Sequence, residues 1–129
     1  MYIKIIDEQE KRALLKNYSV FINKTALRKF AKKSGYGQEY EGVTFKENMI
    51  PEWEWEQELN DIKDNQVVLQ VVYPATISDN KEAEENVYLD FDEFYTYLTE
   101  VVDERIAESP EDKEEYEQLL AEVKTALEL

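Results

Sequence analysis

The fold is decided by a run of seven residues that ends before a proline, Val67-Val68-Leu69-Gln70-Val71-Val72-Tyr73. Its β-branched residues predict a buried strand, and Pro74 marks the end of that strand. We place this strand at the centre of a sheet. Val87-Tyr88-Leu89 predicts a short strand that pairs with it in an antiparallel ladder. Upstream, Val43 and Phe45 alternate with polar neighbours, which predicts a further half-buried strand.

Segments with the apolar spacing of a helix precede and follow these strands in the sequence. Apolar residues keep helical spacing from residue 91 to residue 106, behind an aspartate that serves as N-cap. Ser109-Pro110-Glu111-Asp112 predicts the start of a last helix, which must run back against its predecessor because the link is short. Nearer the N-terminus, residues 7–18 and 24–33 also predict helices.

These patterns predict an α+β fold in a single domain that spans residues 1–129. We expect N-terminal helices, an antiparallel sheet of three to four strands between about residues 42 and 89, and a C-terminal helical hairpin packed on that sheet. Residues 2–6 also fit a short strand.

The segment from Pro51 to Ile62 fits two patterns. As a strand, it places its two tryptophans on one face and four glutamates on the other; as a helix, it aligns Trp55, Leu59 and Ile62. We favour the strand, and we expect its glutamates to be exposed.

Charge is the most unusual property of the composition. Thirty acidic residues against fifteen basic ones give a formal net charge of −15. Residues 1–37 hold nine Lys or Arg against three acidic residues, so this part carries +6 and the remainder −21. Such a field attracts basic partners and repels nucleic acid and anionic membranes. We interpret the lysines of helix 24–33 as complements to its C-terminal end and to the acidic remainder, although the same face also fits phosphates.

The chain has neither cysteine nor histidine. It therefore lacks the usual general base and the common thiolate and imidazole metal ligands. The carboxylate pairs Glu54 with Glu56 and Asp90 with Asp92 fit a magnesium site or a glycosidase, but such pairs arise by chance among thirty acids. We therefore expect no enzyme, no cofactor and no metal.

Two features favour the cytoplasm. The absence of cysteine removes any need for an oxidising compartment. The N-terminus reaches acidic residues after only a few apolar ones, unlike a signal peptide, and no stretch approaches the ~20 apolar residues that cross a bilayer.

A binding protein needs a contact surface, and the aromatic and acidic segment after Pro51 is the sharpest candidate. Tryptophans anchor interfaces, and carboxylates around them supply steering and charge-assisted hydrogen bonds to a basic partner. The competing interpretation places both tryptophans in the core. The predicted partner-binding residues are Trp53, Glu54, Trp55, Glu56, Glu58 and Asp61, with Glu82, Glu84 and Glu85 as a second patch.

Three stretches resemble one known family. Tyr88-Leu89-Asp90-Phe91-Asp92-Glu93-Phe94-Tyr95-Thr96-Tyr97-Leu98, the start signal at residues 109–112, and Glu41-Gly42-Val43-Thr44-Phe45 are similar to immunity proteins of ribonuclease toxins in contact-dependent growth inhibition and related polymorphic toxin systems. The resemblance implies a cytoplasmic antidote that binds the toxin domain tightly and blocks its RNA-cleaving site. It does not reach the segment 53–64, so the predicted contact residues do not come from the family.

Two other functions fit the same charge. The first is a nucleic-acid mimic, such as a phage inhibitor that occupies a DNA-binding channel, and it predicts competition with DNA. The second is an acidic intracellular adaptor that uses its aromatic face, and it predicts binding that is insensitive to salt.

Overall fold

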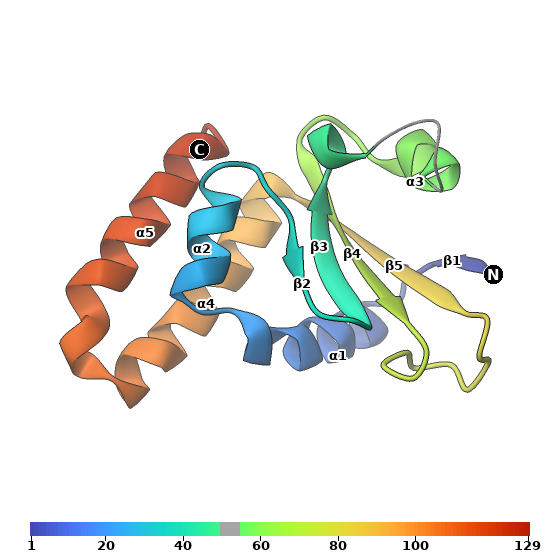
Figure 1. Ribbon diagram of the computed structural model, residues 1–129, viewed down its shortest axis with the longest axis horizontal. Coiled ribbons are helices and arrows are strands. Elements are labelled where there is room, and N and C mark those ends of the chain that lie inside the picture. Colours follow the sequence, from blue (N-terminus) through green and yellow to red (C-terminus); the bar gives the residue numbers. More distant parts are fainter. Residues whose placement is uncertain (50–54) are drawn as a thin grey trace.

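The computed structural model describes residues 1–49 and 55–129. It has the predicted α+β class (Figure 1). The elements in chain order are β1 (Tyr2–Lys4), α1 (Glu8–Tyr18), α2 (Lys24–Phe30), β2 (Tyr36–Gly37), β3 (Glu41–Phe45), α3 (Glu56–Asp61), β4 (Gln66–Val72), β5 (Glu84–Asp90), α4 (Phe91–Glu108) and α5 (Lys113–Ala126).

The strands form one five-stranded sheet in the order β1-β5-β4-β3-β2. The prediction of a central strand after residue 66 is confirmed, because β4 lies in the middle and pairs antiparallel with both β3 and β5. The predicted number of strands, three to four, is too low. The prediction of a purely antiparallel sheet is also wrong for one pair of strands. β1 joins the edge of β5 in parallel, with Tyr2 opposite Glu84. Three residues are too few for their own pattern to indicate a partner so distant in the chain.

Local signals explain where the helices begin. The Asp7 carboxylate accepts a hydrogen bond from the Glu10 amide at 3.3 Å, and the Asn23 side chain accepts one from the Ala26 amide at 2.9 Å. Each bond satisfies an N–H group that has no partner inside the helix. Asp90 forms a capping box with Glu93 at the start of α4.

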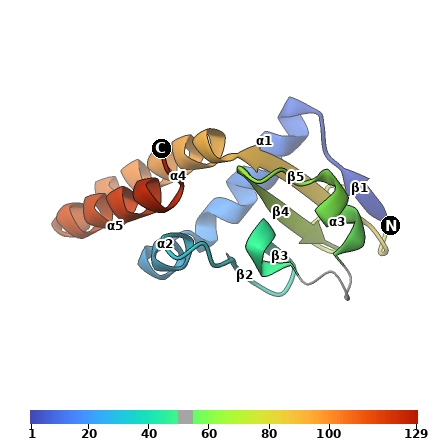
Figure 2. The ribbon, with the colours of Figure 1, turned by 90° about the horizontal axis from the view of Figure 1, so that it is seen from above.

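One face of the sheet is covered by α1, α2 and α4, and α5 packs on α2 and α4 farther from the sheet (Figures 1 and 2). The rings of Phe30, Phe45 and Phe94 meet there, with 5.1 Å between the ring centres of Phe30 and Phe94. α4 and α5 run back against each other, as the short link predicted. This face holds the main hydrophobic core.

The opposite face is covered by α3 at one end of the sheet (Figures 1 and 2). A small buried cluster lies beneath it, formed by Met49, Ile62, Val68 and Tyr88. The predicted strand over residues 51–59 is wrong for its last part, because Glu56–Asp61 is helical. The helical spacing of the apolar residues decided the local structure, since it brings Leu59 and Ile62 onto the sheet.

Within the described ranges, no helix is both long enough and apolar enough to cross a bilayer.

Candidate functional site

The candidate site is the surface formed by α3 and the strands beneath it, which we call the α3 face. Trp55 stands at the N-terminal end of α3 and is half-buried, as is Leu59 one turn later. Both pack on the small cluster around Val68 and Tyr88. Their outer surfaces remain accessible, as expected of aromatic and apolar residues that anchor a partner.

A chain of hydroxyl groups ties α3 to the edge of the sheet. The Tyr2 hydroxyl donates to Asp61 Oδ2 at 2.6 Å and also bonds to the Tyr88 hydroxyl. Because Tyr2 gives its only hydroxyl proton to Asp61, Tyr88 donates to Tyr2. The Lys4 ammonium lies 5.5 Å from the centre of the Tyr88 ring. Segments from β1, α3 and β5 therefore share one polar network.

Burial and charge keep these phenols protonated. Burial raises the pKa of Tyr88 to about 12, and the neighbouring carboxylates of Asp61 and Glu58 act in the same direction. The pKa of Tyr2 is raised further still, first by burial and then by its hydrogen bond to Asp61. Both hydroxyls are consequently hydrogen-bond donors throughout the physiological pH range.

The structure brings part of the first predicted group together. Glu56 is exposed on α3, Trp55 is half-buried beside it, and the half-buried Asp61 accepts the Tyr2 bond. The predicted exposure of the glutamates is wrong for Glu58, whose exposed fraction is 2% because the helical turn directs it towards the sheet. Trp53 and Glu54, which belong to the same prediction, lie outside the described residues.

The second predicted group has three different environments. Glu82 is exposed, and its backbone carbonyl accepts a bond from the amino group of Met1. Glu84 is half-buried and lies opposite Tyr2, so it belongs to the edge of the α3 face.

Glu85 is not a surface residue. It is 3% exposed, and its carboxylate accepts bonds from the Ile77 and Ser78 amides at 2.7 and 3.0 Å. These bonds close the loop between β4 and β5. The predicted patch is therefore wrong in treating Glu85 as an accessible carboxylate.

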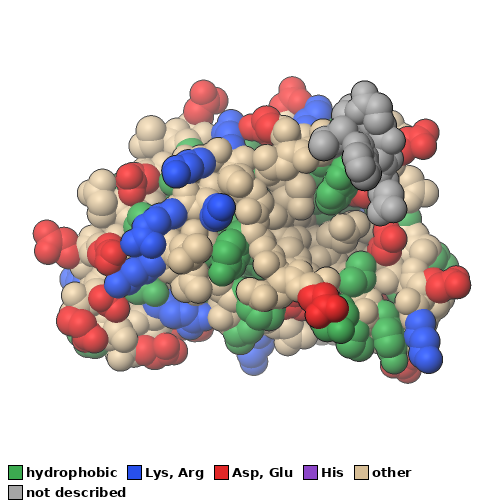
Figure 3. All heavy atoms as spheres, in the orientation of Figure 1, with side chains coloured by type: hydrophobic (Ala, Val, Ile, Leu, Met, Phe, Trp, Pro, Cys, Tyr) green, Lys and Arg blue, Asp and Glu red, His purple; other side chains and the backbone are tan. Residues whose placement is uncertain are grey.

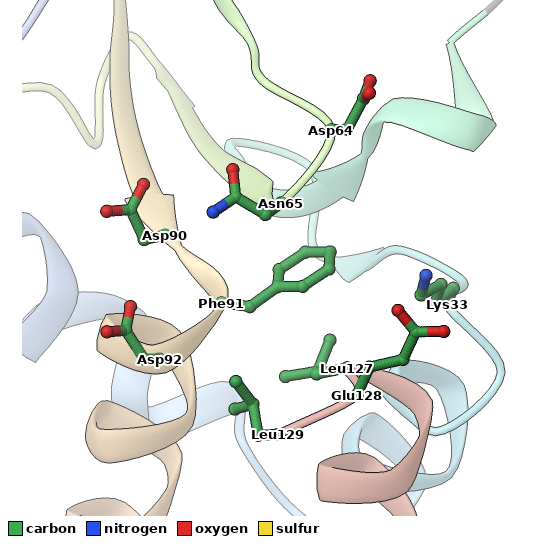
Figure 4. Close-up of a pocket in the computed structure, with 9 residues that line it drawn as sticks. All are labelled: Lys33, Asp64, Asn65, Asp90, Phe91, Asp92, Leu127, Glu128 and Leu129. Atoms are coloured by element: carbon green, nitrogen blue, oxygen red, sulfur yellow. The ribbon is translucent and has the colours of Figure 1, made fainter.

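A hollow of about 620 Å³ lies between the turn that precedes β4, the start of α4 and the C-terminal residues after α5, and sequence analysis did not predict it (Figure 4). Phe91 occupies its middle, with Asp90 and Asp92 on one side and Lys33 on the other. The Lys33 ammonium lies 5.4 Å from the centre of the Phe91 ring. Asp64, in the turn that follows α3, also lines the hollow.

A second acidic surface was also missed. Residues 91–129 carry thirteen acidic residues against three basic ones, a local charge of −10 that a residue count along the sequence reveals. Most of these carboxylates are exposed on the outer sides of α4 and α5. The apolar periodicity of these helices drew attention to their buried sides instead.

The basic helix α2 is largely compensated within the fold. Lys24 lies 2.9 Å from both Asp112 and Glu115, and Arg28 lies 3.4 Å from Glu115. These ion pairs raise the pKa of Lys24, chiefly through its bond to Asp112. Figure 3 shows basic side chains gathered over α2 with acidic ones beside them. The interpretation of these cations as complements to the acidic remainder is confirmed for Lys24 and Arg28.

In the part of the chain that the structure describes, no three acidic side chains converge closely enough to hold a metal ion. The arrangement of the α3 face is suited to contact with a protein: accessible aromatic and apolar groups, exposed carboxylates, and a rigid sheet behind them.

Comparison with known proteins gives one match. The model of a family described as CDI immunity protein matches residues 4–120. No curated protein and no solved structure matches the chain.

Proposed function

Because the chain belongs to the CDI immunity protein family, we propose that it binds a cognate toxin domain with nuclease activity, most simply a ribonuclease, and blocks that activity through an acidic surface. The match over residues 4–120 is the observation that carries the immunity function. The net charge of −15 supports the choice of a basic, nucleic-acid-cleaving partner.

The physical argument is one of competition for a basic groove. Nucleases bind the phosphates of RNA or DNA with lysine and arginine side chains. An inhibitor that places carboxylates where the phosphates would lie is attracted from a distance and forms charge-assisted hydrogen bonds on contact. Binding alone then prevents cleavage, so the inhibitor requires neither a cofactor nor a catalytic residue of its own.

We propose the α3 face as the centre of that contact. Trp55 and Leu59 supply accessible apolar surface above a rigid cluster, and Glu56 is exposed beside them. A stable interface buries about 800 Å² on each partner. The turn that follows α3 contributes Asp64 to the hollow at Phe91, so it connects the α3 face to that hollow along the chain.

We also propose that the protein acts in the cytoplasm, where a ribonuclease toxin meets its RNA. The absence of cysteine is consistent with that reducing compartment.

The test compares two charge reversals of equal size. The double variant Glu56→Lys/Glu82→Lys changes the α3 end, whereas Asp103→Lys/Glu114→Lys changes exposed positions at the far end of the α4–α5 hairpin. Both raise the net charge by four and reduce long-range attraction alike. We expect the first to weaken toxin binding at least about tenfold more than the second, because it also places like charges in contact.

Binding to the cognate toxin domain is measured by biolayer interferometry, and inhibition is measured by cleavage of labelled RNA and of labelled DNA. Equal losses of affinity in the two variants would mean that these charges act only through long-range attraction. A larger loss in the hairpin variant would indicate that the toxin contacts the α4–α5 hairpin. A parent protein that binds the toxin but leaves cleavage intact would refute blockade of activity. Protection of DNA alone would change the toxin class to a deoxyribonuclease.

A further inference from the structure

Helix α3 is too short to hold its own position. It has six residues, and isolated helices shorter than about 12–15 residues are only marginally stable in water. Its placement therefore depends on contacts with the sheet. Among the described residues, the apolar part of those contacts is small, because the buried cluster under α3 contains four of them.

Asp61 occupies an unfavourable place in this helix. It is the last residue of α3, where the partial negative charge of the helix end repels a carboxylate, and the last turn contains no basic residue. Helix stability alone does not explain an aspartate there. The bond of 2.6 Å from the Tyr2 hydroxyl does, because a charge-assisted bond between partly buried groups offsets the repulsion.

We infer that Tyr2 and Asp61 are positioning residues, which hold α3 against the edge of the sheet in the orientation that meets the toxin. The inference rests on the proposed function of the α3 face. Tyr2 is fixed in turn by the pairing of β1 with β5 and by its bond to Tyr88. Hydrogen bonds among β1, β5 and α3 thus hold the short helix against the sheet.

This role differs from direct contact between Asp61 and the toxin. In a direct contact, the Asp61 charge matters and the Tyr2 hydroxyl competes with the toxin for that carboxylate. In a positioning role, the hydroxyl matters most, and the charge contributes only through the strength of the bond that it accepts. Two substitutions separate these cases: Tyr2→Phe removes only the hydroxyl, and Asp61→Asn removes the charge but keeps an oxygen that accepts the same bond.

The matched control is Tyr97→Phe. The Tyr97 hydroxyl donates to the Leu15 carbonyl at 2.6 Å, the length of the Tyr2 bond, but on the helix-covered face. Both variants delete one partly buried hydroxyl, so we expect similar losses of thermal stability. Only Tyr2→Phe should loosen α3.

Two measurements test the inference. Hydrogen exchange of the free protein follows the Leu59 and Ile62 amides, which bond to the Trp55 and Glu58 carbonyls inside the helix. Interferometry follows dissociation of the toxin domain. For Tyr2→Phe we expect faster exchange in α3, toxin dissociation about fivefold faster and unchanged association, because no charge is altered. Tyr97→Phe should dissociate like the parent, and Asp61→Asn, which keeps an acceptor but loses the charge assistance, should dissociate faster than the parent but more slowly than Tyr2→Phe.

The inference is overturned if Tyr2→Phe leaves both exchange and dissociation unchanged, or if it loosens α3 while dissociation stays the same. A loss of association in Asp61→Asn together with a neutral Tyr2→Phe would assign Asp61 to direct contact instead. Failure of the proposed function looks different, because the Glu56→Lys/Glu82→Lys variant would then bind the toxin as well as its hairpin control.

Discussion

On one face of the sheet, the described residues of the strands and of α1, α2, α4 and α5 form a core of twenty-four buried hydrophobic residues. On the other face, within the described ranges, α3 covers four. Polar bonds compensate for part of this difference, since Tyr2, Asp61 and Tyr88 are joined by hydroxyl groups. The helix-covered face therefore supplies most of the stability of the fold, whereas the α3 face carries the contact surface proposed above.

If the proposed contact is correct, stability and recognition are largely separable in this molecule. Substitutions on the helix-covered face should change the free energy of unfolding first and toxin binding only through unfolding. Substitutions on the α3 face should change binding by more than their cost in stability. The expected outcomes below test this division in order of decreasing effect.

The largest effect is expected from Phe94→Ala. Phe94 is completely buried and touches the rings of Phe30 and Phe45, so its removal leaves a cavity that rigid neighbours cannot fill. We expect a loss of about 3–5 kcal/mol in the free energy of unfolding, measured by urea denaturation. The exposed neighbour Glu100→Ala is the control. A loss below about 1 kcal/mol would show that this core does not dominate stability.

An intermediate effect is expected from Ile62→Ala beneath α3. Ile62 is 5% exposed in the small cluster, and we expect a loss of about 2 kcal/mol because few neighbours surround the cavity. Toxin binding, measured by calorimetry under conditions where the variant is fully folded, should fall as well. Ile6→Ala is the matched control, since Ile6 is 77% exposed. If Ile62→Ala is destabilised but binds the toxin like the parent, the expectation that the α3 face governs binding is wrong.

The smallest expected effect is a gain in the free energy of unfolding, from Glu41→Gln on the helix-covered face. Burial raises the pKa of Glu41 above its ordinary value, so the folded state holds the proton more tightly than the unfolded state. The ionised carboxylate therefore lowers stability at neutral pH, and this cost disappears as the pH falls below the ordinary glutamate range. Glu41→Gln should unfold at higher urea than the parent at about pH 7 and equally at about pH 4.

The exposed neighbour Glu39→Gln serves as the control for that comparison. An advantage of Glu41→Gln that persists unchanged in acid would show that ionisation of the buried carboxylate is not its cause.

Sequence reasoning predicted what short-range patterns determine. The strand after residue 66, the helix after Asp90 and the returning last helix are all present, because each carries its own apolar period and its own start signal. The edge strand β1 was indicated only as an element. Its parallel pairing with β5 joins residues more than eighty positions apart, and no local period encodes that choice.

The candidate site was harder to predict. Alternating tryptophans and glutamates imitate a strand, while the spacing of Trp55, Leu59 and Ile62 fits the helix observed over Glu56–Asp61. That choice also decided the exposure of Glu58, which is buried. The role of Glu85 was equally hard to predict, because its carboxylate accepts hydrogen bonds from loop amides seven and eight residues earlier in the chain.

The pairing of β1 with β5 also has a consequence for the order in which the molecule becomes complete. Tyr2 is made long before its strand partner Glu84 and its hydroxyl partner Tyr88, because Tyr88 follows it by 86 residues in the chain. Long-range pairings of this kind form late in folding. A growing chain therefore contains α3 before it contains the edge that holds α3 in place. In the proposed function, protection is a property of finished chains, and a cell that begins to make this protein gains no inhibitor from the nascent ones.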